Sequence, residues 1–472
     1  MTGRDWFALS ILAALTIART LAYLVFAPVH FDSDQAVFGI MAIDLAHLKA
    51  LPIVMYGQTY LLAVIAWLAA PLFAMFGPSI ALLKAPFVPI NVLAVGVLYL
   101  VLRKSARLDV AASTIVAATL ALPTVVLSQS FMNASGGHLE PVLYVTLVFL
   151  LRRRPIALGV AGAFMVAHRE VTAVALFALL AVELWRTEDR RRVSGRWLKT
   201  AVVFAIALAA IRWAAHWSTN YGGLEAGYAP TNDVANSISW LATDASVLLG
   251  LAPHDLRDAG FLLPFVEGSR VSAVAIGVLA VLAIVTVARS WRSWRRDASN
   301  EVGEYLVLTC ALVALAFVGR EMTHDTLLIR YLFMLALLPA ALGAWILAGE
   351  TSRALRLTTL AALIWLAAAN GVANGKYYRA LSDARLPDRL GAVATFLDEQ
   401  GVTTGIAPYW VAYNLTFRTG GKVHVASSEL VRIPAYQEEY DAHRDRAVRI
   451  DVGPCDSGRE ILVRGVKVCM PK

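Results

Sequence analysis

Two closely spaced carboxylates, Asp32 and Asp34, follow the first long apolar segment of the chain, residues 6–27. This order places both acids at a membrane boundary, next to apolar surroundings. Burial raises the pKa of a carboxylate, and a buried, well-aimed carboxylate is the kind of general base that activates a hydroxyl group. The alternative is structural, because aspartate is also a preferred N-cap residue of helices.

A second polar group is the segment Asn-Ala-Ser-Gly-Gly-His-Leu-Glu at residues 133–140. Paired glycines permit an unusual turn and a close approach of the backbone to another group. We therefore expect the segment to present His138 and Glu140 at the outer end of a short helix.

A third group, His168-Arg169-Glu170, interrupts the apolar stretch between residues 156 and 184. Ionisable residues at membrane depth are costly unless they are paired or face a wet cavity, so they are candidates for function. The structural alternative is an Arg–Glu pair that only holds two helices together.

A fourth group comprises residues 320–325, Arg-Glu-Met-Thr-His-Asp, and the pair Arg330-Tyr331 at the start of the next apolar stretch. A guanidinium group binds phosphate through two parallel hydrogen bonds. Arg330 is therefore a candidate clamp for a lipid phosphate. With Tyr331 it also suits a simple anchor at the membrane interface.

The elements that must position these groups are membrane-spanning helices. The chain of 472 residues is 58% hydrophobic and 16% charged, whereas soluble proteins are about a quarter charged. Because about 20 apolar residues cross a bilayer, the sequence predicts a mainly α-helical, polytopic membrane protein with about eleven transmembrane helices. After residues 6–27, apolar segments begin near Ile80, Val110, Pro141, Pro155, Thr172, Ala201, Val271, Glu304, Tyr331 and Leu357.

Basic residues mark alternate breaks between these segments, and short cytoplasmic loops are enriched in Lys and Arg. We therefore expect a cytoplasmic N-terminus, a periplasmic or extracellular C-terminus, and all four polar groups at the outer face of a bacterial inner membrane. The net charge of +8 is mostly this orientation signal, so nucleic acid is not an expected partner. The basic breaks are residues 103–107, 152–154, 186–192, 289–296 and 353–356.

Two outer loops are too long to be simple connections. Residues 28–79, within a transmembrane domain of residues 1–373, suit helices that lie in the membrane interface. Residues 216–270 form a second outer loop, rich in Trp, Tyr, Asn, Pro and Gly. Long loops in compact folds usually carry function.

The tail at residues 374–472 loses the long apolar runs and gains charges, which predicts a small α/β domain on the outer side. Its pattern favours an amphipathic helix at 386–400 and strands at 423–425 and 461–468. Aromatic residues gather at 407–414, a composition that suits either stacking on sugar rings or the core of a small domain.

The three cysteines agree with this layout. Cys310 lies within an apolar run, whereas Cys455 and Cys469 lie in the tail. In an oxidising compartment the latter two are expected to form a disulfide that closes a loop of about 15 residues and contributes about 3 kcal/mol on the chain-entropy model.

These motifs resemble those of the GT-C superfamily, the polyprenyl-phosphate-sugar-dependent glycosyltransferases that include protein O-mannosyltransferases and lipid A aminoarabinose transferases. The resemblance covers nearly the whole chain. It rests on the acidic motif, on Met-Tyr-Gly-Gln-Thr-Tyr at 55–60, on Phe-Gly-Pro-Ser at 76–79, on the Arg330-Tyr331 helix start and on the exported tail. In the relatives the acidic motif is usually Asp-Glu, which corresponds to Asp34-Gln35 in this chain.

The resemblance implies an inverting transfer of a sugar from a polyprenyl-phosphate carrier to a hydroxyl group of an envelope glycan, lipid or protein on the outer face. Asp34 is then the catalytic base. The residues expected to support it are Asp32, His138, Glu140, His168 and Glu170; those expected to bind the donor phosphate are Arg330, Arg169 and Tyr331; and those expected to bind substrate are Tyr56, Gln58 and Tyr60.

No bound cofactor is expected, because the carrier brings the sugar already activated and the sequence has neither a P-loop nor a dinucleotide fingerprint. Asp32-Ser33-Asp34 has the Asp-x-Asp spacing with which oligosaccharyltransferases of the superfamily hold a divalent cation. The prediction nevertheless favours a site without a required metal. The alternative class is a lipid or solute transporter, which should show internal repeats; no repeat is evident in this sequence.

Overall fold

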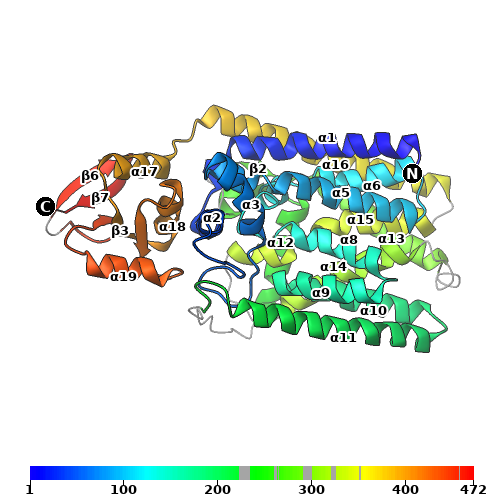
Figure 1. The fold of residues 1–472 in the computed structure, drawn as a ribbon. Helices are drawn as coiled ribbons and strands as arrows, with labels where there is room; N and C mark the ends of the chain where they lie inside the picture. The colour runs from blue at the N-terminus through cyan, green and yellow to red at the C-terminus, as the bar shows by residue number, and fades with distance from the viewer. Residues whose placement is uncertain are drawn as a thin grey trace.

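A computed structural model describes residues 1–222, 234–259, 263, 265–290, 300–319, 326–349, 352–455 and 458–471. The segment 320–325, one of the predicted polar groups, lies outside the described residues. Figure 1 shows most of the helices side by side in one elongated bundle, with the N-terminus at one end and the C-terminal domain beyond the other.

Helices make up almost all of the bundle, as the composition predicts. They are α1 (Gly3–Val25), α2 (Ser33–Ala46), α3 (Val64–Phe76), α4 (Ile80–Lys84), α5 (Phe87–Lys104), α6 (Val110–Ala121), α7 (Val125–Ser130), α8 (Glu140–Leu151), α9 (Pro155–His168), α10 (Ala173–Arg186), α11 (Arg190–Ala215), α12 (Val234–Leu249), α13 (Arg270–Ser290), α14 (Glu301–Gly319), α15 (Leu338–Gly349) and α16 (Arg353–Ala384). Short 3₁₀ helices are η1 (Ala27–His30), η2 (Glu170–Thr172), η3 (Leu256–Ala259) and η6 (Thr326–Leu337).

Within the described residues, six helical segments are long and apolar enough to cross a bilayer: Gly3–Val25, Ile80–Lys104, Arg190–Ala215, Glu301–Gly319, Ile329–Gly349 and Arg353–Ala384. Shorter apolar helices, among them α6, α8 and α9, lie between them. The chain is therefore a multi-pass membrane protein, and the total of eleven crossings stays a prediction.

Ion pairs join the helices at the end of the bundle where α1 begins. Arg103 Nε lies 2.8 Å from Asp5 Oδ1, and Arg186 Nε lies 2.7 Å from Glu304 Oε2. These arginines belong to the basic breaks in the sequence. The basic end of the bundle is thus the end opposite the C-terminal domain (Figure 1).

The first long loop contains the helix that carries the acidic motif. After α1, the chain forms η1 and then α2, which packs against α3 and against α18 (Tyr409–Arg418) of the C-terminal domain. Residues 51–63 connect α2 to α3 with little regular structure.

The second long loop contains more structure than the sequence pattern suggested. Helix α12 packs against η6 and α14. It is followed by a two-stranded antiparallel ribbon of β1 (His254–Asp255) and β2 (Val266–Glu267). Residues 223–233 of this loop lie outside the part of the chain that the structure describes.

Helix α16 continues through residue 374 and ends at Ala384, where Arg385 adopts a left-handed conformation with φ of 43°. The chain enters the C-terminal domain only after this helix. The domain is α/β, as predicted. Its elements are α17 (Arg389–Glu399), β3 (Thr404–Ala407), α18 (Tyr409–Arg418), β4 (His424–Ser427), α19 (Pro434–Ala442), β5 (Val448–Ile450), β6 (Arg459–Val463) and β7 (Val466–Met470).

Five strands form one mixed sheet in the order β4-β3-β5-β7-β6. β3 pairs in parallel with both β4 and β5, so α18 and α19 serve as the crossover helices. The stretch 461–468, read from the sequence as a strand, is instead the antiparallel hairpin of β6 and β7. Its turn residues, Arg464 and Gly465, both have positive φ. A disulfide joins Cys455 to Cys469 at the end of β7.

Candidate functional site

The acidic motif forms the first turn of α2. Asp32 is the N-cap: its Oδ1 accepts a hydrogen bond from the Gln35 backbone N at 2.9 Å, and its Oδ2 accepts one from Gln35 Nε2 at 2.8 Å. Burial and the neighbouring Asp34 carboxylate raise the pKa of Asp32. The capping role considered for this motif is thus filled by Asp32, which leaves Asp34 in the first turn with its side chain one-quarter exposed.

Gln35 occupies the position that a second acid holds in the family motif, and it connects three segments of backbone. Its Nε2 also donates to His30 O at 2.9 Å, and its Oε1 accepts from Ala134 N at 3.1 Å. Lys84 donates to the same His30 carbonyl at 2.8 Å. An amide suits this position because its Nε2 donates hydrogen bonds while its Oε1 accepts one. An ionised carboxylate only accepts.

Asp34 is contacted by two side chains of the C-terminal domain. The Tyr409 hydroxyl donates a short hydrogen bond to Asp34 Oδ1, and Arg432 Nη2 lies 3.9 Å from the same oxygen. Arg432 Nε donates to the Tyr409 hydroxyl oxygen at 3.3 Å. Sequence reasoning missed both residues as part of the site, although Tyr409 lies in the aromatic segment 407–414.

The first outer loop and the C-terminal domain meet where Arg432 Nη1 donates to Gly57 O at 3.3 Å. Gly57 has a φ of 67°, and a Cβ at this position would lie 2.9 Å from the Arg432 Cα. On α2, a Cβ on Gly39 would lie 2.5 Å from the Phe417 ring. Glycine at both positions therefore lets the domain approach the membrane part closely.

Three further predicted residues share the electrostatic surroundings of Asp34. Arg330 lies within range of Asp34, Tyr60 and Tyr331, and its guanidinium carbon is 5.3 Å from the centre of the Tyr331 ring. Burial, Tyr331 and Glu170 raise the pKa of Tyr60, so its hydroxyl stays protonated and remains a donor. The structure thus brings Tyr60, Arg330 and Tyr331 to the same site.

The segment 133–140 holds Arg169 in place. Gly136 and Gly137 have φ of 72° and 76°, as the paired glycines predict, and the Gly136 carbonyl accepts a short hydrogen bond from Arg169 Nη2. Glu140 Oε2 accepts from Gly137 N at 2.9 Å. Arg169 and Arg330 are close enough to interact electrostatically, so the third and fourth polar groups of the sequence converge.

The two predicted histidines sit deeper in the structure. His138 packs edge-on against Phe333 with 4.9 Å between ring centres, and burial with the charges of Arg169 and Arg330 lowers its pKa to about 3. His168 is buried, and its Nδ1 lies 2.8 Å from the Tyr144 hydroxyl. Both rings therefore pack against aromatic side chains, and Glu170 follows Arg169 as the first residue of η2.

The remaining predicted substrate residues are placed differently. Tyr56 is fully buried and donates to Asp44 Oδ2 at 2.9 Å, so its hydroxyl is engaged within the loop. Gln58 follows Gly57 in the same turn, and its Oε1 is buried without a hydrogen-bond partner among the described residues. Tyr60 is 46% exposed and is the member of this group that remains open to a substrate.

The carboxylates of the acidic motif already have protein partners in this arrangement. Both oxygens of Asp32 accept hydrogen bonds from Gln35, and Asp34 is turned to Tyr409 and Arg432. In the described residues no three acidic, His or Cys side chains gather in a way that would hold a metal ion. A site without a metal stays a prediction, consistent with the positive charge that the arginines already supply.

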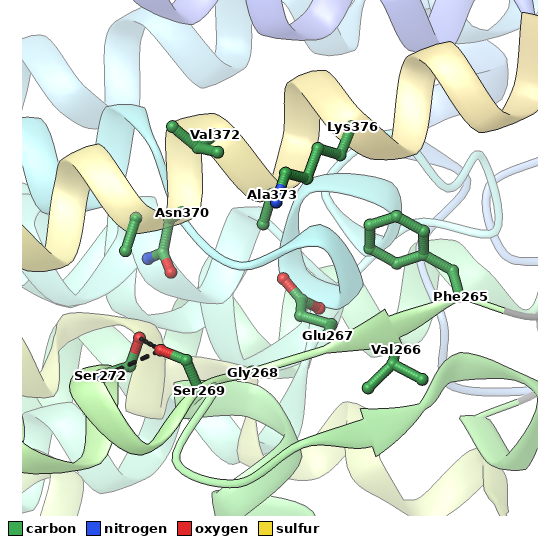
Figure 2. A pocket seen from close by; sticks show the side chains of 12 residues that line it. Phe265, Val266, Glu267, Gly268, Ser269, Ser272, Asn370, Val372, Ala373 and Lys376 are labelled. Atoms are coloured by element: carbon green, nitrogen blue, oxygen red, sulfur yellow. Dashed lines mark hydrogen bonds between the residues drawn. The ribbon is translucent and has the colours of Figure 1, made fainter.

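A separate hollow of about 170 Å³ lies between α16 and the segment 265–272, and none of the residues around Asp34 line it. Figure 2 shows Glu267, Asn370 and Lys376 around it. Glu267 is buried beneath the start of α7, where it accepts hydrogen bonds from the backbone N of Val125 and, at 3.2 Å, of Val126. Burial raises its pKa to about 7.

The hollow connects to the acidic motif through two aromatic side chains. The Phe265 ring packs edge-on against Tyr377 with 5.2 Å between ring centres. The Tyr377 hydroxyl lies 2.9 Å from His30 Nε2, in the turn just before Asp32. The end of α16 is thereby tied to the start of the acidic motif.

The fold is similar to that of two solved membrane proteins. ArnT from Cupriavidus metallidurans in the apo state matches with a TM-score of 0.61 and 10% identity, over 95% of this chain and 96% of that one. The structure of the same protein bound to undecaprenyl phosphate matches with a TM-score of 0.56. Archaeal oligosaccharyltransferase AglB from Archaeoglobus fulgidus, in complex with an inhibitory peptide and a dolichol-phosphate, matches with a TM-score of 0.51 and 13% identity, over 94% of this chain and 69% of that one.

The chain therefore has the GT-C fold, as its motifs suggested. No protein-family model and no curated protein sequence matches it. At 10–13% identity the likeness is one of fold, so the chemistry has to be argued from the residues of the site itself.

Proposed function

We propose that the protein is an inverting glycosyltransferase that moves a sugar from a polyprenyl-phosphate carrier to an acceptor hydroxyl group on the outer face of the membrane. The observation that carries the proposal is a carboxylate, Asp34, near guanidinium groups that have unused donors. The Nε atoms of Arg330 and Arg169 are buried and have no hydrogen-bond partner among the described residues. A phosphate anion would satisfy both donors with charge-assisted hydrogen bonds.

In the proposed reaction, Asp34 accepts the proton of the acceptor hydroxyl group while the acceptor oxygen attacks the anomeric carbon of the sugar. The bond between that carbon and the phosphate oxygen breaks, and its electron pair leaves with the polyprenyl phosphate. Arg330 and Arg169 neutralise the charge that develops on the leaving phosphate. Because bond formation and bond breaking occur in one displacement, the anomeric configuration inverts.

The supporting residues act through their neighbours in this proposal. Asp32 caps α2 and so orients Asp34, while Glu140 secures the glycine turn that holds Arg169. Tyr60 and Tyr331 interact electrostatically with Arg330, and in the proposal their hydroxyl groups bind the sugar or the phosphate.

The carrier lipid is the natural donor for a site in this position. Of the structures with the same fold, one holds undecaprenyl phosphate and another holds a dolichol-phosphate together with an inhibitory peptide. The acceptor is a glycan, lipid or protein that bears a hydroxyl group.

The orientation follows from the basic end of the bundle. Because Lys and Arg favour the cytoplasmic side, the end that carries Arg103 and Arg186 faces the cytoplasm of a bacterial inner membrane. The C-terminal domain and Asp34 then face the periplasm. A cysteine introduced at Lys49, an exposed position just after α2, and labelled only from the cytoplasmic side would reverse this orientation.

The test is release of carrier phosphate by the purified protein from a panel of polyprenyl-phosphate sugars. We expect Asp34→Asn to lower the rate by at least about 100-fold, the usual contribution of a general base. Asp44→Asn is the matched control on the same helix, because Asp44 pairs with Tyr56 away from the arginines. Loss of release in Asp34→Asn alone supports the proposal.

The competing function is transport of a lipid or solute. If neither the wild-type protein nor any variant releases phosphate from any donor, while vesicles containing the protein move lipid or solute across the bilayer, transport replaces transfer as the function.

A further inference from the structure

The C-terminal domain contacts the proposed catalytic base, Asp34, through the hydroxyl group of Tyr409. Tyr409 is the first residue of α18, directly after Pro408, and its ring is buried against Trp410 and Tyr413. Its hydroxyl donates to Asp34 Oδ1. Burial and the Asp34 carboxylate raise the pKa of Tyr409, so the phenol keeps its proton and acts as the donor.

The hydrogen bond from Tyr409 to Asp34 is of the kind that an acceptor hydroxyl group would make. In the proposed reaction the acceptor presents an O–H group to Asp34, and Tyr409 already presents one to Oδ1. The phosphate-binding guanidinium groups of Arg330 and Arg169 come from η6 and from the residue after α9, on the membrane side of the site. A one-step displacement needs the acceptor and the leaving group on opposite faces of the anomeric carbon.

We propose that Tyr409 marks the acceptor subsite: its hydroxyl holds the place of the acceptor hydroxyl on Asp34, and the acceptor binds on the C-terminal-domain side of the base by displacing it. The ligand class is a hydroxyl-bearing acceptor. The assignment rests on the proposed function and adds to it the face from which the acceptor arrives.

Arg432 is the positioning residue of this subsite. Its guanidinium group donates to the Tyr409 hydroxyl oxygen and to the Gly57 carbonyl oxygen, both at 3.3 Å. The same group lies 3.9 Å from Asp34 Oδ1. When the acceptor displaces Tyr409, Arg432 still connects the domain to the loop and stays beside the base. Until then, Tyr409 occupies Asp34 Oδ1, so this oxygen is not free to take a proton from water and hydrolyse the donor.

The experiment measures hydrolysis of a polyprenyl-phosphate sugar with no acceptor present, by the release of free sugar. Tyr409→Phe removes only the hydroxyl group and leaves the buried ring. We expect about tenfold faster hydrolysis than in the wild type, because a hydrogen bond to a charged group no longer competes with water for Asp34.

Tyr436→Phe is the matched control, since this tyrosine lies in the same domain and stacks on His424 away from Asp34. It should hydrolyse the donor at the wild-type rate. Arg432→Gln is a second variant, which keeps the Tyr409 side chain but removes the guanidinium group that donates to its hydroxyl oxygen, and it should also raise hydrolysis. Thermal unfolding of each variant shows whether it is folded.

Hydrolysis by folded Tyr409→Phe and Arg432→Gln at or below the wild-type rate would overturn the acceptor subsite and leave the proposed function standing, provided the wild type releases carrier phosphate. If the wild type and all variants release none from any donor, the proposed function fails, and the subsite fails with it.

Discussion

Arg169 lies directly against Gly137: a Cβ on Gly137 would sit 1.5 Å from Arg169 Nε. Gly137 also has a φ of 76°, which side-chain-bearing residues rarely adopt. The glycine is therefore required twice, once by the backbone turn and once by the guanidinium group that fills the space of its missing side chain. In the proposed reaction this is the guanidinium group that helps to bind the carrier phosphate.

Gly137→Ala should displace Arg169 and reduce transfer at least about tenfold, with a stability loss of about 1–3 kcal/mol from backbone strain and collision. Gly77→Ala is a control for the positive φ alone, because Gly77 has a φ of 79° and nothing within 4 Å of a new Cβ. Donor turnover and thermal unfolding of both variants test the prediction. Equal activity in the two variants would show that the position of Arg169 does not matter.

Arg330→Lys keeps the positive charge but removes the planar pair of donors. We expect donor KM to rise about tenfold, and Arg330→Ala to lower kcat/KM by about 100-fold, since a preorganised donor to the leaving group is lost. Arg444→Ala, on an exposed pair with Asp441, should change neither value. Steady-state kinetics over donor concentration measures both, and an unchanged Arg330→Ala would remove this residue from the phosphate site.

Transfer should withstand removal of divalent cations. Each Asp32 oxygen already accepts a hydrogen bond from Gln35, and arginines supply the positive charge near Asp34. Activity measured after EDTA treatment, with and without added Mg²⁺ or Mn²⁺, should stay the same. Activity that disappears with EDTA and returns with either cation would contradict the prediction and require Asp32 to change its partner.

Glu267 should make stability depend on pH near neutrality. Its pKa is 4.5 in an unfolded chain and about 7 in the fold, because it is buried. An acid with a raised pKa binds its proton more tightly when folded, so this contribution is fully present below about pH 4.5 and is lost as the pH rises through about 7. The unfolding free energy should fall by up to about 3 kcal/mol between these values.

Glu267→Gln should flatten that slope, because glutamine does not titrate. Unfolding of the detergent-solubilised wild type and variant at pH 5 and pH 8 makes the comparison. The same slope in both proteins would assign the pH dependence to other groups.

Much of the architecture could be predicted because a membrane helix is recognised from its own local sequence. A run of apolar residues between basic breaks identifies a span without knowledge of its neighbours, and Asp34, Arg169 and Arg330 stood out because charge is rare at that depth. The hairpin of β6 and β7 was less visible. Its turn at Arg464-Gly465 interrupts a continuous alternation of side chains by only two residues.

The contribution of the C-terminal domain to the site could not be read from the sequence. Arg432 lies in a polar tail where arginine is common, and no local pattern links it to Asp34. Tyr409 sits among other aromatic residues that form the core of the domain, so composition does not single out its hydroxyl group. Both positions depend on how the domain docks, which close packing at Gly39 and Gly57 determines.

The hydrogen bond between Tyr377 and His30 fixes the position of the acidic motif along the length of α16. Tyrosines concentrate where hydrocarbon gives way to headgroups, and Tyr377-Tyr378 stand near the end of a helix of 32 residues, which at about 1.5 Å per residue exceeds the thickness of the hydrocarbon core. The acidic motif is thus held at a set height relative to the lipid surface. A bilayer of different thickness would shift the carrier headgroups relative to Asp34. We therefore expect the rate of transfer to depend on membrane thickness.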